Sequence, residues 1–284
     1  MTPPSTDFGL DADCSLVQKV AQSRRARGIL PKVKKILMPI LVAGALVLPA
    51  ACGSEQAATD SKPSTPAAVG LSQADFAPKI QAAMLAKGTF RTVSVSDDEG
   101  DKTTYTTDVK YSTDGSELSG KSDGTGEDAL SLVRAGGQVY VKTPKLSKNE
   151  AQPWAKADLK STDPKVILNG VLIRLAQMQF MTHDLIGGAP YATGFSSEPA
   201  GEATVYTMKV SLSKAAAANA LGAYLTADVA SGLEGKALTI NVTVGKDLLP
   251  TTIALKDDDA KVVTSFSKYG DPVTVKAPAA AEVA

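Results

Sequence analysis

The spacing of apolar side chains first follows a helical period and then changes to a two-residue period. Phe76, Ile80 and Met84 recur every four residues, and a glycine stands just beyond them. Side chains four apart lie on one face of a helix, and glycine is common where a helix ends. The pattern predicts a helix over residues 76–87, with Asp75 as its N-cap.

Beyond this helix, apolar and polar side chains alternate as in half-buried strands. Short links such as DDEGD at 97–101, AGG at 135–137 and DDDA at 257–260 separate several runs. Short links join antiparallel neighbours, because parallel strands need long crossovers. The two acidic links lack the spacing of a calcium loop, so we expect solvated hairpin tips there. The predicted strands cover residues 89–96, 104–112, 129–134, 138–142, 205–212, 237–244, 251–255 and 261–267.

Two further helices interrupt the strands. Residues 163–179 begin with Asp-Pro and carry apolar side chains around nearly the whole helical circumference, and residues 214–229 are rich in alanine. No internal repeat is visible in the sequence. This order predicts an α+β fold, in which a large curved antiparallel sheet carries a few helices on one side.

The N-terminal region has the layout of an export signal. Six basic side chains between residues 24 and 35 precede the uncharged apolar run ILMPILVAGALVL at 36–48. A helix of that length spans roughly 20 Å, less than the roughly 30 Å hydrocarbon layer, so a secretory signal is favoured over a membrane span. The run ends in LPAAC, which resembles the lipobox of bacterial lipoproteins, with Pro49 where leucine is usual. The resemblance implies that Cys52 is lipidated.

Composition divides the chain into four parts. The segment GSEQAATDSKPSTPAAVG contains almost no large apolar side chain and is expected to be a flexible tether. A translation start near Val33 would still leave a compact signal, so the true start stays open. The predicted parts are a signal at 1–52 with Cys52 as the first mature residue, the tether at 53–70, a folded domain at 71–278 and a disordered tail at 279–284.

Charge narrows the possible partners. The first 52 residues carry seven basic and three acidic side chains, so the remainder carries 23 basic and 27 acidic ones. A mildly acidic surface disfavours nucleic acid and electrostatic docking onto anionic lipid headgroups. Attachment would then come from acyl chains, each buried methylene contributing about 0.8 kcal/mol. We expect a lipid-anchored protein on the extracytoplasmic face of the cell membrane.

Two short motifs suggest enzymes but lack the required context. GSELSGKS at 115–122 fits a phosphate-binding loop, and residues 120–124 fit a nucleophile elbow. Both motifs need a strand-to-helix turn, whereas here the preceding strand alternates and DGTGED follows. We therefore interpret this segment as a hairpin.

Histidine and cysteine are too scarce to support a catalytic or metal site. His183 is the only histidine, and we expect it to be a helix-end or loop residue with ordinary hydrogen bonds. With Cys14 in the signal and Cys52 lipidated, only carboxylates would remain as further metal ligands. We expect no catalytic residue, metal or cofactor, and no enzymatic activity.

Several segments together resemble the actinobacterial LppX/LprG-type lipoproteins, relatives of the LolA-like carriers. They are GGQVYVKTP…QPWAKADL at 136–159, GEATVYTMKVSLSKA at 201–215, LLPTTIAL at 248–255 and VVTSFSKYGDPVTVKAP at 262–278. The resemblance implies a half-barrel whose antiparallel sheet curls around helices and encloses an apolar cavity for acyl chains. It also implies transport or presentation of lipids or lipoglycans at the envelope, with an envelope transport protein as a possible partner.

The nearly all-round apolar helix at 163–179 agrees with such a cavity, and methionines suit a tolerant lipid site. A filled core explains the same residues equally well, so a lipid-anchored interaction or scaffold module without a cavity remains the alternative. A two-lobed solute-binding lipoprotein is disfavoured by the hairpin-rich pattern. The residues expected to face the cavity are Ile80, Met84, Val93, Val95, Leu172, Leu175, Met178, Met208 and Val210.

Overall fold

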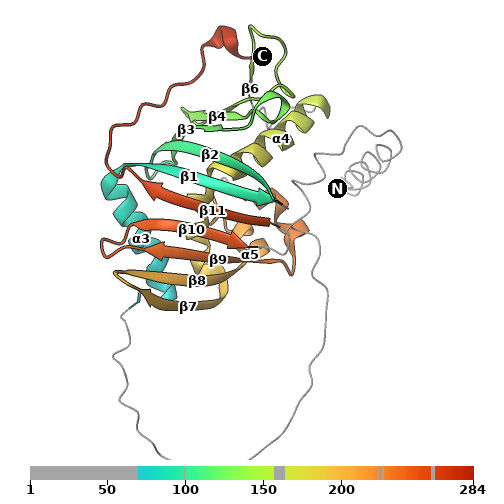
Figure 1. The fold of residues 1–284 in the computed structure, drawn as a ribbon. Helices are drawn as coiled ribbons and strands as arrows, with labels where there is room; N and C mark the ends of the chain where they lie inside the picture. The colour runs from blue at the N-terminus through green and yellow to red at the C-terminus, as the bar shows by residue number, and fades with distance from the viewer. Residues whose placement is uncertain (1–69, 99, 157–163, 223, 226, 257–259) are drawn as a thin grey trace, which may run out of the picture. The chain divides into compact units, whose positions relative to one another are not determined.

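The computed structural model describes most of the chain after residue 69 (Figure 1). The chain divides into two units, residues 1–50 and 51–284, and all described residues belong to the second, compact unit. The predicted signal, Cys52 and nearly all of the predicted tether lie outside the described residues. The described ranges are 70–98, 100–156, 164–222, 224–225, 227–256 and 260–284.

An antiparallel sheet of 11 strands dominates this unit, in the order β6-β5-β4-β3-β2-β1-β11-β10-β9-β8-β7. The sheet is open, with β6 and β7 as its edges, and a few helices accompany it. The predicted α+β class is therefore confirmed. The strands are β1 (Thr89–Asp98), β2 (Asp101–Lys110), β3 (Glu117–Ser122), β4 (Ser131–Ala135), β5 (Gln138–Lys142), β6 (Trp154–Lys156), β7 (Ala192–Ala200), β8 (Ala203–Ser211), β9 (Ala237–Val244), β10 (Pro250–Lys256) and β11 (Ala260–Ser267).

Helical segments pack on one face of this sheet (Figure 1). Among the described residues, no helix combines the length and apolar character needed to cross a bilayer. The α-helices are α3 (Gln73–Lys87), α4 (Pro164–Phe180) and α5 (Leu212–Ala217). The 3₁₀ segments are η3 (Gly126–Asp128), η4 (Thr182–Tyr191), η5 (Ala227–Leu233) and η6 (Ala280–Glu282).

Helix α3 begins three residues before the predicted start. Ser72 is the N-cap in place of Asp75, because its extended backbone lets Oγ accept a 3.2 Å hydrogen bond from the Asp75 N–H. Asp75 lies in the first turn, where its negative charge complements the helix dipole. Gly88 ends the helix in the left-handed conformation, with φ 72°, as the sequence predicted.

The predicted alanine-rich helix over 214–229 is wrong in its length. Helix α5 ends at Ala217, and Asn219 adopts φ 52°, which an α-helix cannot contain. Leu221 is then fully buried beside Gly188 of η4, where an added Cβ would lie 2.9 Å from its Cδ2. Burial of this leucine against another element outweighs the helix propensity of the alanines.

Alternation along β1 defines two faces of the sheet. Phe90, Thr92 and Ser94 are buried, and the ring of Phe90 meets the ring of His183 in η4 at 5.4 Å. We call the face that carries these side chains the inner face. Strand partners share a face, so the register extends it across the sheet: Ser94 is opposite Thr264, and their hydroxyl oxygens lie 2.7 Å apart.

The region of the apparent phosphate-binding loop is a meander. Strand β3 pairs antiparallel with both β2 and β4, and only the three-residue η3 follows it. The hairpin interpretation of 115–122 is confirmed, because a phosphate-binding loop joins a parallel strand to a helix. The strands on either side of the acidic link also form a hairpin, with Asp98 of β1 opposite Asp101 of β2, whereas residue 99 and residues 257–259 lie outside the described residues.

The last residues are not the disordered tail that the sequence predicted. Residues 280–282 form η6, and Val283 forms a parallel bridge with Trp154 of the edge strand β6. The N–H of Ala284 donates to the Trp154 carbonyl at 2.8 Å, and Gln152 Nε2 donates to the Val283 carbonyl at 3.3 Å. The unpaired edge of β6 supplies partners that composition alone does not reveal.

Candidate functional site

The space between the inner face and the helices is the candidate site, and one side of it is closely packed. Ile80 and Met84 of α3 and Met208 and Val210 of β8 are completely buried. Segment η4 contacts both α3 and β8, which brings these two pairs into one layer. The four residues therefore lie inside, within an apolar core. That they line a cavity stays a prediction.

Helix α4 contacts the other half of the sheet, at β2, β4 and β5. Ile173, Ala176 and Phe180 are at most 7% exposed and form its buried stripe. Three more of the predicted residues, Leu172, Leu175 and Met178, lie beside this stripe and remain half-buried. We call these three residues the α4 flank. At about 100° per residue, the two sets together cover roughly 200° of the helix surface.

Gly120 of β3 allows α4 to approach the sheet. A Cβ at this glycine would lie only 2.5 Å from Cδ1 of Phe180, so the phenyl ring occupies the space of the missing side chain. Tyr105 of β2 meets the same ring edge-on, with centroids 5.4 Å apart. Phe180 thereby fixes the C-terminal end of α4 on the inner face.

The prediction that Val93 and Val95 face the interior is wrong. Both are half-buried and alternate with the inward Phe90, Thr92 and Ser94. We call their side of the sheet the outer face. β-Branched residues such as valine favour a strand whichever face they occupy, so two valines do not indicate which face of the sheet is buried. The aromatic residue Phe90 was the better signal for the buried face.

Buried polar side chains interrupt the apolar interior where α4 gives way to η4. Thr182 and His183 are each 2% exposed, and among the described residues neither Thr182 Oγ1 nor either ring nitrogen of His183 has a hydrogen-bond partner. The predicted ordinary hydrogen bonds of His183 are therefore absent from the described structure. Its Nε2 lies 3.5 Å from Oδ1 of Asp184, too long for a well-formed bond.

Aromatic rings enclose His183. Besides Phe90, the ring of Tyr111 meets it edge-on, with centroids 5.9 Å apart. Burial lowers the pKa of His183, although the Asp184 carboxylate opposes that effect. Burial also raises the pKa of Tyr111 to about 12, aided by the negative charge of Asp184. Both groups are therefore neutral at neutral pH.

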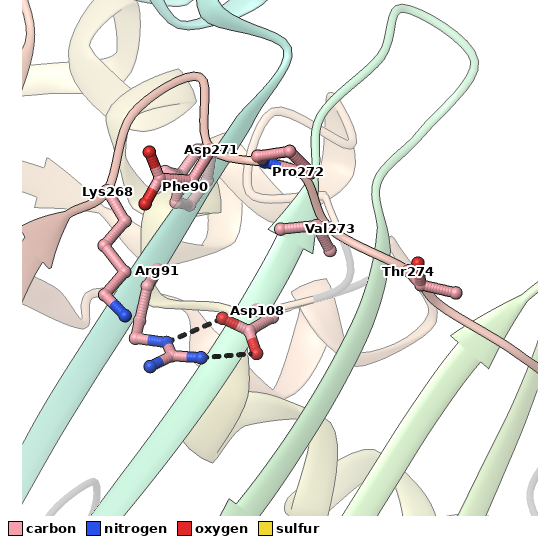
Figure 2. Close-up of a pocket in the computed structure, with 8 residues that line it drawn as sticks. All are labelled: Phe90, Arg91, Asp108, Lys268, Asp271, Pro272, Val273 and Thr274. Atoms are coloured by element: carbon pink, nitrogen blue, oxygen red, sulfur yellow. Dashed lines mark hydrogen bonds and ion pairs between the residues drawn. The ribbon is translucent and has the colours of Figure 1, made fainter.

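A separate pocket of about 150 Å³ opens where the chain leaves β11 (Figure 2). Arg91 donates from Nε and Nη2 to the two carboxylate oxygens of Asp108, at 2.7 and 2.8 Å. Balanced charges line the pocket, and its volume is below the roughly 300 Å³ at which ligand sites begin. Its lining residues are Phe90, Arg91, Asp108, Lys268, Asp271, Pro272, Val273 and Thr274.

Within the described ranges, no group of three or more His, Cys, Asp or Glu side chains is arranged to hold a metal ion. Cys52 lies outside those ranges, so its lipidation stays a prediction. What the described site offers chemically is apolar surface on α4 and unpartnered polar groups at the start of η4.

Comparison with known proteins identifies similar solved structures. No protein-family model and no curated protein matches the chain. Lipoprotein LppX of Mycobacterium tuberculosis is similar over 72% of this chain and 100% of its own, with 14% identity and a TM-score of 0.41. LprF of Mycobacterium bovis is similar over 72% and 98%, with 13% identity and a TM-score of 0.39.

MucB in the Pseudomonas aeruginosa MucA/MucB complex is also similar, over 68% of this chain and 56% of its own, with 13% identity and a TM-score of 0.31. The LppX/LprG-type resemblance is thus confirmed in the sense that LppX and LprF are among the similar solved structures. The fold described above rests on the strand order of this chain, and its function has to be argued from its own residues.

Proposed function

We propose that this protein is a lipid-anchored carrier that binds acyl chains between the inner face and α4 and moves or presents lipids at the cell envelope. The observation that carries the proposal is the width of the apolar surface on α4. Its buried stripe already anchors the helix to the sheet, so stability does not account for the half-buried α4 flank beside it.

An acyl chain suits this surface. It would lie along Leu172, Leu175 and Met178, and the flexible thioether of methionine adapts to chains of different shape. Each methylene that leaves water contributes about 0.8 kcal/mol, and the gain is similar in a bilayer and in a protein interior. Exchange between the two is then close to neutral in free energy and reversible, as passive transfer requires.

Anchoring would keep the carrier beside its source of lipid. Diacylation of Cys52 provides two chains, enough for stable attachment, and the 17 residues from 53 to 69 link the anchor to the folded unit. A polar chain of this length has a root-mean-square reach of roughly 20–25 Å. The binding unit can thus approach the membrane surface without entering it.

Lipid content of the isolated unit tests the proposal. All described residues belong to the unit 51–284, so this part of the chain can be produced with Cys52→Ser and purified without detergent. We expect lipid in an organic extract, detected by mass spectrometry, and uptake of a pyrene-labelled fatty acid. Neither copurified lipid nor uptake would reject the carrier and favour a lipid-anchored interaction module with a filled interior.

Matched variants locate the binding surface. Leu172→Gln with Leu175→Gln should weaken fatty-acid uptake roughly tenfold or more, because two apolar contacts are lost. Val93→Gln with Val95→Gln removes two similar side chains from the outer face and should leave uptake unchanged. Equal effects of the two pairs would contradict binding along α4.

A further inference from the structure

Arg134 extends the polar features of the interior. On β4 it is opposite Leu118, which is opposite Val109 of β2, which in turn is opposite Phe90 of β1. Strand partners share a face, so the side chain of Arg134 leaves the sheet on the inner face. Its Nη2 lies beside Gly115, 3.2 Å from where a Cβ would stand there.

The charge of Arg134 is not neutralised within the described structure. No hydrogen bond or ion pair joins this half-buried guanidinium to another described residue, whereas Arg91 on the outer face is paired through two bonds to Asp108. An inward cation without a partner is costly unless something else supplies negative charge.

Arg134 stands at one end of an inner-face row of strand partners, and His183 packs on Phe90 at the other end of that row. Three strand spacings of about 4.8 Å put the backbones of Phe90 and Arg134 roughly 14 Å apart, and long side chains bridge much of that. His183 packs on Phe90 from η4, and the positive charge of Arg134 is close enough to contribute to lowering the pKa of His183.

We propose that Arg134, Thr182 and His183 bind an anionic head group, a carboxylate or phosphate, at the polar end of the acyl ligand. This inference rests on the proposed carrier function and adds the class of lipid. A hydroxyl, an imidazole N–H and an unpaired guanidinium all donate hydrogen bonds, and such bonds are strongest to an ionised acceptor. Asp184 faces Nε2, which leaves Nδ1 directed away from that carboxylate.

The position of these groups also orients the ligand. Helix α4 ends at Phe180, two residues before Thr182. A head group bound at Thr182 and His183 therefore allows the acyl chain of the ligand to run back along the α4 flank. The C-terminal end of α4 and Asp184 both bring negative charge to this place. An anionic head group beside these two negative charges therefore needs a nearby cation, and we assign that role to Arg134.

Ligands with the same chain and different heads test the inference without any mutation. Palmitate and hexadecyl phosphate should bind roughly tenfold tighter than methyl palmitate and hexadecanol at mildly alkaline pH, measured by displacement of a fluorescent fatty acid. Equal binding of charged and neutral ligands would overturn the anionic site and leave the carrier function intact. Binding of none of the four would reject both proposals.

Variants assign the preference to Arg134. Arg134→Gln should abolish the preference for charged ligands while methyl palmitate binds as before. Lys142→Gln removes the same charge from an exposed position on β5 and should keep the preference. A preserved preference in the Arg134 variant, or its loss in the Lys142 variant, would contradict the assignment.

The single histidine offers an independent readout. Because the chain contains one His, its imidazole resonances are unique in an NMR titration. An anion beside the ring stabilises the protonated form, so palmitate should raise the pKa of His183 and methyl palmitate should not. An unchanged pKa with bound palmitate would place the head group elsewhere.

Discussion

The two halves of the sheet use similar apolar residues for different ends. On the half covered by α3 and η4, the side chains of Ile80, Met84, Met208 and Val210 are completely buried. On the half covered by α4, Leu172 and its neighbours on the α4 flank are only half-buried. The difference shows that apolar character alone does not distinguish a core from a surface available to a ligand; the number of packed neighbours decides it.

The same contrast extends to polar groups. On the half covered by α3 and η4, hydroxyl groups form hydrogen bonds across strands, as Ser94 does with Thr264. Where α4 meets η4, the side chains of Thr182 and His183 are buried and have no hydrogen-bond partner in the part of the chain that the structure describes. Native interiors rarely leave polar groups unpaired, so the joint between the halves is the place where a ligand would add most.

The sharpest test of the comparison truncates one methionine in each half. Met208→Ala should destabilise the 51–284 unit by about 2–4 kcal/mol, because a fully buried side chain leaves a cavity. Met178→Ala makes the same change on the half-buried α4 flank and should cost less than about 1.5 kcal/mol. Urea unfolding measures both, and equal costs would show that the two halves are equally packed.

A side chain added at Gly120, where Phe180 of α4 packs on the sheet, should disturb only the half of the sheet that α4 covers. Gly120→Ala places a methyl against Phe180 and should destabilise by about 1–3 kcal/mol, and adding Phe180→Leu should recover part of the loss. Gly194→Ala on the edge strand β7 meets only Lys209 Cβ at 3.9 Å and should be nearly neutral. Thermal melts compare the variants; a neutral Gly120→Ala would mean that α4 does not depend on this contact.

Acidification should lower the folding stability through His183, which lies where α4 meets η4. Burial holds the folded pKa of His183 below its ordinary value, so the unfolded chain takes up the proton first and stability falls as pH decreases below about 6.5. The slope approaches at most about 1.4 kcal/mol per pH unit below pH 6.5, until the pH reaches the folded pKa of His183. Stability curves at several pH values measure it, and His183→Phe should flatten the curve there.

Other groups titrate outside that range. A hydrogen bond from the backbone N–H of Gly136 lowers the pKa of Glu117, and one from the backbone N–H of Thr104 lowers the pKa of Asp123. The contributions of these two carboxylates to folding stability are therefore lost only in more acidic solution. A slope that persists above pH 5 in the His183→Phe variant would show that another group is responsible.

The smallest effect is expected at the edge of the α4 half. Deleting residues 280–284 removes the backbone bond from Ala284 to Trp154 and should cost no more than about 1 kcal/mol. Trp154 is the only tryptophan, so a red shift of its fluorescence reports the added exposure. Gln152→Ala, which removes one bond to Val283, should shift the emission less. An unchanged spectrum after the deletion would mean that the tail does not cover β6.

Periodicity alone determined much of the fold. Strands at 138–142 and 237–244 were predicted with their observed bounds, because alternation and short turns are local properties of a chain. The same reasoning identified α4 and the end of α3 at Gly88. Local patterns also excluded a phosphate-binding loop at 115–122, because a strand in a meander does not lead into the helix that such a loop requires.

Only the tertiary structure decided which residues face one another. Nothing local distinguishes the two sides of β1. The contact of Phe90 with His183 defines the inner face, and the alternation along the strand then places Val93 and Val95 on the outer face. The early end of α5 and the docking of the tail on β6 likewise depend on distant partners. Only three strand pairings place Arg134 on the inner face without a partner among the described residues, because the face that a side chain occupies is a property of the assembled fold and not of any stretch of sequence.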